Sequence, residues 1–122
     1  MKILIADNVS QHAVEILREQ ESWDVVFLPK KAGANVAEEI RDADALVVRS
    51  ATKVTAQLLA HAEHLRVIGR AGVGVDNVDI GAATQQGVVV MNTPGGNAWS
   101  VAEHTVALLL SLARHVPRPM PQ

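Results

Sequence analysis

The chain has 122 residues, 48% of them hydrophobic and 20% charged, so we expect a domain with a buried core and not a disordered tail. Its net charge of −2 gives no electrostatic reason to bind nucleic acid or an anionic membrane. The absence of cysteine excludes disulfides and thiolate metal ligands, and no apolar run is long enough for a signal peptide or a membrane span. These properties predict a cytoplasmic protein without a metal site.

Short apolar runs alternate with amphipathic segments as far as residue 93. The apolar runs predict five strands, at residues 2–7, 23–29, 45–50, 65–70 and 88–93. The segments between them predict four helices, at residues 10–20, 35–44, 55–64 and 79–86. We expect Pro29 to stop the second strand, and Asn35, Thr55 and Asp79 to start helices.

The strands are apolar along nearly their whole length. Such strands are typical of a parallel sheet that helices cover on both faces. The predicted fold class is therefore α/β, with a flavodoxin-like, doubly wound parallel sheet of five strands.

A fifth helix is predicted at residues 100–116, where Ser100 and Glu103 have the spacing of a capping box. Its apolar residues cover almost the whole circumference, so we expect it to be buried against a larger body or a partner, and to mediate self-association. The last six residues, "PRPMPQ" (117–122), are typical of a linker. We therefore expect residues 1–99 to belong to one domain and residues 100–122 to lead toward another that lies outside this chain.

The stretch "GRAGVGVDNVD" (69–79) invites comparison with a dinucleotide-binding loop. After Gly72 and Gly74, that motif requires a third glycine where this chain has Asn77, and the next strand ends without the acidic residue that the motif places there. We therefore do not expect it to hold a pyrophosphate. The glycines would let backbone N–H groups converge on a smaller anion, although a plain tight turn explains them equally well.

Two arginines follow neighbouring strands of the predicted sheet. Arg49 ends the third strand and Arg70 the fourth, so both guanidiniums and the glycine loop should face one crevice. A ligand with a carboxylate and a phosphate would suit them, whereas a solvated surface is the commoner place for a single arginine. The loop "NTPGGNAWS" (92–100) ends the fifth strand at the same edge, where Asn97 is either a ligand contact or a local turn residue.

Three stretches together carry a family resemblance: "VVRSATKVTAQLL", "GRAGVGVDNVD" and "NTPGGNAWSVAEHT". They resemble the D-2-hydroxyacid dehydrogenases. The resemblance implies a two-domain enzyme, with a flavodoxin-like substrate domain and an inserted Rossmann domain that binds NAD. This chain would supply the N-terminal part of the substrate domain and the helix that crosses toward the cofactor domain.

The resemblance also implies roles for particular residues. It assigns substrate contacts to Arg49, Ser50, Arg70, Val73, Gly74 and Asn97. The amides at 73 and 74 would hold the substrate carboxylate, and the second arginine would assist a phosphate. Val73 and Val101 would border the cofactor, although related enzymes often have threonine at position 73, and valine lacks its hydroxyl.

The implied substrate is 3-phosphoglycerate or a related phosphorylated 2-hydroxy acid, and NAD would be bound mainly by the missing domain. The family takes its catalytic Arg, Glu and general-acid His from later parts of the chain, so we expect this segment to be inactive alone. His104 follows a residue that capping already explains, and we assign it no catalytic role. The alternatives are a dehydrogenase of another D-2-hydroxy acid, or a standalone domain that binds a small anion. A receiver-type signalling module is disfavoured, because Arg49 and Ser50 stand where its phosphoacceptor aspartate belongs.

Overall fold

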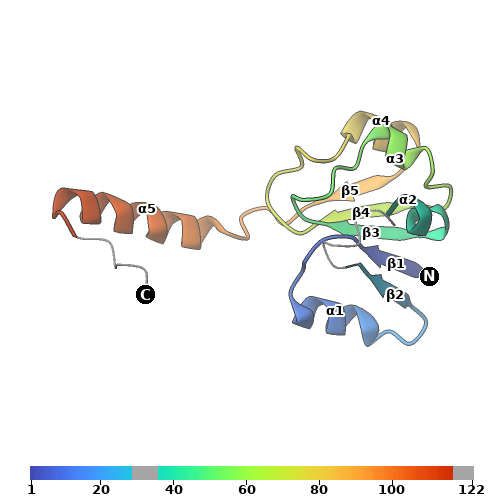
Figure 1. Ribbon diagram of the computed structural model, residues 1–122, viewed down its shortest axis with the longest axis horizontal. Coiled ribbons are helices and arrows are strands. Elements are labelled where there is room, and N and C mark those ends of the chain that lie inside the picture. Colours follow the sequence, from blue (N-terminus) through green and yellow to red (C-terminus); the bar gives the residue numbers. More distant parts are fainter. Residues whose placement is uncertain (29–35, 117–122) are drawn as a thin grey trace.

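The computed structural model describes residues 1–28 and 36–116 (Figure 1). The expectations for Pro29, Asn35 and the linker at 117–122 fall outside the described residues. The strands are β1 Lys2–Ile5, β2 Asp24–Phe27, β3 Ala45–Val48, β4 Val67–Arg70 and β5 Val89–Met91. The helices are α1 Gln11–Arg18, α2 Val36–Glu39, α3 Ala56–Leu59, α4 Ile80–Gln85 and α5 Ala98–Ala113, and the 3-10 turn η2 Ile40–Asp42 follows α2.

The five strands form one parallel sheet in the order β2-β1-β3-β4-β5. This is the flavodoxin-like order, so the predicted fold class is confirmed. All strands run the same way, and their carboxyl ends therefore meet at one edge of the sheet. In the register of β3 and β4, Val48 of β3 lies opposite Arg70 of β4.

The strand pleat divides the core into two layers. On one face Leu4, Leu46 and Ile68 are fully buried and belong to the cluster formed with α2, α3 and α4. On the other face Ile3 and Ile5 pack with residues of α1. Figure 1 shows α1 on one side of the sheet and α3 and α4 on the other.

Part of the second face is uncovered, so the prediction of a sheet covered on both faces is wrong there. Val89 and Met91 of β5 are 57% and 56% exposed, although their neighbour Val88 is buried. The reason is that α1 packs beside β2, at the opposite side of the sheet from β5. Among the described residues, the apolar cluster that packs with α1 on this face includes no residue of β5.

Side-chain caps determine where most helices begin. The Ser10 hydroxyl accepts a hydrogen bond from the N–H of Ala13, and Thr55 and Asp79 act in the same way at α3 and α4. The helix predicted at 55–64 is only one turn long. After Leu59 the chain continues in turns with bonds to the third residue back, such as Ala62 N–H to the Leu59 carbonyl.

The last helix begins at Ala98, two residues before the predicted start. The carbonyl of Asn97 accepts from the Val101 N–H at 2.9 Å, so Ser100 lies inside the first turn and the capping box with Glu103 is wrong. The cause is the preceding turn, in which Gly95 has a φ of 72° and its carbonyl accepts from the Ala98 N–H. This turn leads directly into the helix without a side-chain cap.

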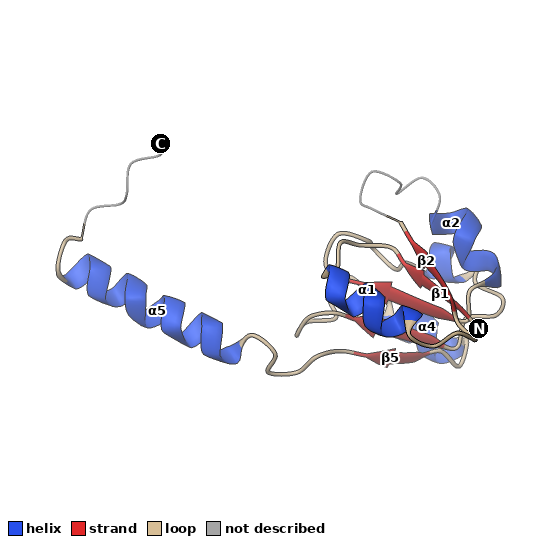
Figure 2. Ribbon diagram, turned by 90° about the horizontal axis from the view of Figure 1, so that it is seen from below, coloured by secondary structure: helices blue, strands red, loops and turns tan. Residues whose placement is uncertain are grey.

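Helix α5 extends away from the sheet (Figures 1 and 2). None of its residues is buried, and Trp99 and Leu112 are 84% and 73% exposed. The burial expected for this helix is therefore not provided by the described part of the chain. No helix within residues 1–28 and 36–116 has the length and apolar character needed to cross a membrane.

Candidate anion-binding site

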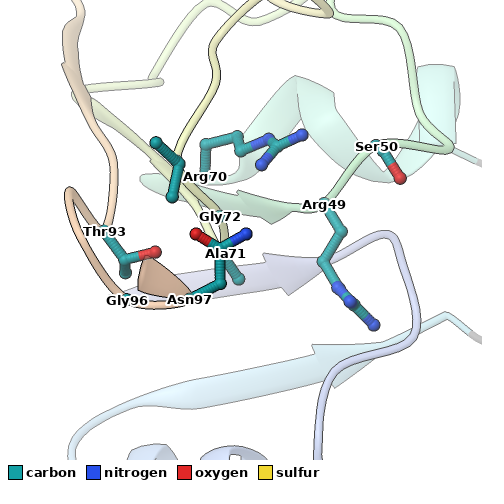
Figure 3. Close-up of a pocket in the computed structure, with 9 residues that line it drawn as sticks. Arg49, Ser50, Arg70, Ala71, Gly72, Thr93, Gly96 and Asn97 are labelled. Atoms are coloured by element: carbon teal, nitrogen blue, oxygen red, sulfur yellow. The ribbon is translucent and has the colours of Figure 1, made fainter. Parts of the chain in front are cut away.

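A cavity of about 450 Å³ lies where β3, β4 and β5 end (Figure 3). It is formed by the segments that follow these three strands. Its lining residues are Arg49, Ser50, Arg70, Ala71, Gly72, Val73, Thr93, Gly96 and Asn97. Five of the six predicted substrate contacts are among them, and Gly74 is not. The sequence patterns did not point to Thr93, because a threonine in a loop carries no distinctive signal.

Hydrogen bonds between the strand ends hold the three segments together. The Ala71 N–H donates to the Val48 carbonyl at 2.8 Å, and the Thr93 N–H donates to the Gly72 carbonyl at 2.9 Å. The Asn92 amide also donates to the Val73 carbonyl at 2.7 Å. The glycine loop is therefore fixed from both sides.

The two arginines line the same cavity but leave the sheet on opposite faces. Arg70 lies opposite Val48 in the register, so Arg49 is one residue further along and the pleat turns it the other way. Arg49 Nη1 donates to the Asn8 carbonyl at 3.2 Å, and Figure 3 shows the two guanidiniums pointing in different directions. The expectation that both face one crevice is correct for the cavity and wrong for their direction. Across residues 1–28 and 36–116 neither arginine forms an ion pair.

Within the glycine loop, backbone donors face no protein acceptor. Among the described residues, the N–H groups of Val73 and Gly74 make no hydrogen bond to the protein. The lack of a side chain at Gly72 makes room for Arg70, whereas the prediction was that the glycines let N–H groups converge on an anion. A Cβ there would overlap Nη1 of Arg70 and lie 2.8 Å from its Cζ, so this space is filled by the guanidinium and not by a ligand.

Asn97 is placed at the cavity, and Val101 is not. Asn97 caps α5 through its backbone and makes no side-chain cap bond, so its amide remains available to the cavity. Figure 3 shows it entering from the 92–97 loop, opposite Arg49 and Ser50. Val101 is 54% exposed on α5 and is absent from the lining, as is His104 further along that helix.

The most buried charged group near the site is Asp7, which the sequence patterns did not assign to it. Asp7 is 3% exposed and accepts from the N–H groups of Arg49, Ala51 and Thr52, and from the Thr52 hydroxyl at 2.6 Å. Burial raises the pKa of this carboxyl, but these hydrogen bonds outweigh burial and leave the pKa below its ordinary value of 3.8. Asp7 therefore fixes, in ionised form, the backbone that carries Arg49.

The described residues do not form a dinucleotide site. No helix begins at Asn77; α4 begins at Ile80, after an isolated bridge between Val54 and Val78. The strand that follows ends at Met91 without a carboxylate. Within the described ranges there is also no group of three His, Asp or Glu residues that could hold a metal ion.

The fold and the cavity together define a flavodoxin-like α/β domain with a cleft, lined in part by two arginines, at the carboxyl edge of its sheet. Residues 3–114 match the family model described as D-isomer specific 2-hydroxyacid dehydrogenase, catalytic domain. The chain belongs to this family.

The chain is similar to curated proteins and to solved structures that are longer than it is. It is 47% identical over 118 residues to D-3-phosphoglycerate dehydrogenase of Archaeoglobus fulgidus, and the aligned region covers 97% of this chain and 22% of that protein. The NAD+-bound 3-phosphoglycerate dehydrogenase of Entamoeba histolytica is 34% identical with a TM-score of 0.82, over 100% of this chain and 42% of that one. An NAD-dependent formate dehydrogenase of Staphylococcus aureus is 27% identical with a TM-score of 0.80, over 94% and 39%. The chain thus spans about a fifth of the length of its curated relatives.

Proposed function

We propose that this chain is the substrate-binding part of an NAD-dependent D-3-phosphoglycerate dehydrogenase, which oxidises 3-phosphoglycerate to 3-phosphohydroxypyruvate at the start of serine biosynthesis. The observation that carries the proposal is the composition of the cavity. Within residues 1–28 and 36–116, its two arginines have no carboxylate partner, and the N–H groups of Val73 and Gly74 in the glycine loop have no protein acceptor. The names of the relatives support the choice of this enzyme within the family.

In this proposal the substrate spans the cleft. Its carboxylate accepts from the N–H groups of Val73 and Gly74, and its phosphate contacts Arg70, while Arg49 and Ser50 line the pocket. The Asn97 amide contacts the substrate next to the nicotinamide ring, and Val73 and Val101 border that ring.

NAD would supply the hydride acceptor, and it would be held mainly by residues outside this chain, because the loop after β4 does not fit a pyrophosphate. The catalytic Arg, Glu and His would also come from outside it. The residues of this chain would bind and orient the substrate and exclude water from one side of it. Mixed with NAD and 3-phosphoglycerate, the chain alone should form no NADH.

The test is a titration of the isotope-labelled chain with 3-phosphoglycerate, followed by the chemical shifts of its backbone amides. The shifts should be confined to the loops after β3, β4 and β5. Arg70→Ala should weaken binding at least about tenfold, because it removes charge-assisted hydrogen bonds. Arg66→Ala is the matched control, since Arg66 is exposed and precedes the opposite end of the same strand. Equal weakening by both variants would contradict the proposal.

Another D-2-hydroxy acid is the second candidate substrate, and the similarity to a formate dehydrogenase supports keeping it, because that fold also serves a small unphosphorylated acid. Titration with D-glycerate and D-lactate separates the two. Tighter binding of either than of 3-phosphoglycerate would favour this candidate. A standalone anion-binding domain is a third candidate. It would be favoured if the native protein binds one of these acids but contains no catalytic domain.

We also propose that the chain forms a homo-oligomer through the 100–116 helix, in the cytoplasm, and that residues 100–122 lead to a cofactor domain. The exposed apolar residues of α5, such as Leu109 at 62% and Leu112 at 73%, support self-association, because a large apolar surface rarely stays solvated. Sedimentation velocity across a concentration series should show more than a monomer.

A further inference from the structure

One side chain connects both arginines of the cleft. The Asn77 amide nitrogen donates to the Arg49 carbonyl at 2.6 Å and to the Thr52 carbonyl at 2.8 Å. Its amide oxygen accepts from Nε of Arg70 at 3.4 Å. Asn77 therefore holds the backbone that carries one arginine and the guanidinium of the other.

The backbone of Asn77 is itself fixed. Its carbonyl accepts from the Val54 N–H at 2.8 Å, and the Asp79 N–H donates to the Val54 carbonyl at 2.8 Å. These bonds form the bridge between the loop after β3 and the loop before α4. An amide on this bridge is a fixed point against which Arg70 is oriented.

Gly72 supplies the second half of the arrangement. The Arg70 guanidinium lies across Gly72, where any side chain would overlap it. The obstacle is the far end of a flexible side chain, so an added Cβ would displace the guanidinium at little cost to the backbone.

The chemistry of Asn77 also matters, because it is neutral. It orients Arg70 through Nε while leaving the positive charge of the guanidinium uncompensated. An aspartate at this position would accept the same hydrogen bond but would neutralise the charge, and it would lose both bonds that the amide nitrogen donates.

We propose that Asn77 and Gly72 are positioning residues that set the specificity of the cleft: they orient Arg70 with its charge free, so that a ligand bearing a phosphate is preferred over one bearing only a carboxylate. This inference rests on the proposed function for its ligand, but the positioning itself does not. Arg70 would be the residue that touches the phosphate, and the other two act through it.

The first measurement needs no ligand. In the isotope-labelled 122-residue chain, the Nε–H of Arg70, identified by its loss in Arg70→Lys, should exchange with water at least about fivefold more slowly than that of the exposed Arg18, as expected for one net hydrogen bond. Asn77→Ala and Gly72→Ala should abolish this difference. Gly69→Ala is the matched control, because a Cβ at Gly69 would meet no atom within 4 Å. Fast exchange at Arg70 in the native chain would overturn the positioning.

The second measurement compares 3-phosphoglycerate with D-glycerate. Gly72→Ala should weaken 3-phosphoglycerate about tenfold or more and leave D-glycerate within about twofold, because only the phosphate loses charge-assisted bonds. Asn77→Asp should also weaken only the phosphorylated ligand while Arg70 remains slow to exchange. Equal weakening of both ligands by Gly72→Ala would overturn the assignment of specificity. Failure of the native chain to bind either ligand would overturn the proposed function and the specificity with it, while the exchange rates alone decide the positioning.

Discussion

Replacement of Asp7 tests how strongly the loop after β3 depends on one buried carboxylate. Its four hydrogen bonds come from three backbone N–H groups and one hydroxyl. Asp7→Ala leaves the three N–H groups without their acceptor, at roughly 1 kcal/mol or more each, so the free energy of unfolding should fall by about 3–4 kcal/mol.

Asp7→Asn should cost less, because the amide oxygen can accept the three N–H groups and the Thr52 hydroxyl can turn to accept from the amide nitrogen. Bonds to a charged group are worth about 1 kcal/mol more than neutral ones, but the neutral side chain is easier to bury. We expect a net loss of about 1–2 kcal/mol. Urea unfolding followed by circular dichroism, with tryptophan fluorescence as a second probe, measures both variants.

The dependence of stability on pH tests the same residue in a second way. The pKa of Asp7 is lower in the folded chain than its ordinary value of 3.8, so the unfolded chain binds this proton more readily. The stability that ionised Asp7 contributes is complete above that value and disappears as the pH falls through the folded pKa. The difference in the free energy of unfolding between the native chain and Asp7→Asn should therefore decrease in acid. A difference that stays constant with pH, or an Asp7→Ala variant no less stable than Asp7→Asn, would refute the reasoning.

Three further predictions concern the core, a helix cap and the surface of α5. Leu46→Ala removes a fully buried side chain from the centre of the sheet and should lower the free energy of unfolding by about 3 kcal/mol in urea titrations; a loss below about 1 kcal/mol would contradict its place in the core. Asp79→Ala removes the cap on the Ala82 N–H and should cost about 1 kcal/mol by the same assay, with Asp79→Ser restoring most of it. Leu109→Glu combined with Leu112→Glu should leave stability unchanged and shift sedimentation toward the monomer; an unchanged distribution would show that α5 is not the contact.

The sheet and most helix starts could be predicted because their signals are local. Each strand is an apolar run, and Thr55 and Asp79 cap the helices that immediately follow them. The start of α5 differs from the predicted one because Ser100 and Glu103 have the spacing of a capping box, whereas the turn at Gly95 leads into the helix before them. A spacing pattern alone cannot reveal which of two nearby starts the backbone uses.

The cleft could be predicted in outline because parallel strands bring their ends together. The hydrogen bonds that hold its loops in place could not be predicted from the sequence. Asp7 bonds to groups 42 to 45 residues later in the chain, and Asn77 bonds to carbonyls 25 and 28 residues earlier. The divergence of Arg49 and Arg70 depends on strand register, which is a property of pairing and not of either strand by itself.

The one-residue stagger between Arg49 and Arg70 determines which ligands can contact both guanidiniums at once. One cation stands above the plane of the sheet and the other below it, so a molecule with two separated negative groups can engage both while a compact ion meets one at a time. Deleting a single residue from β3 would move Arg49 to the same face of the sheet as Arg70. Both guanidiniums would then lie on one face, with every side chain of the cleft still present.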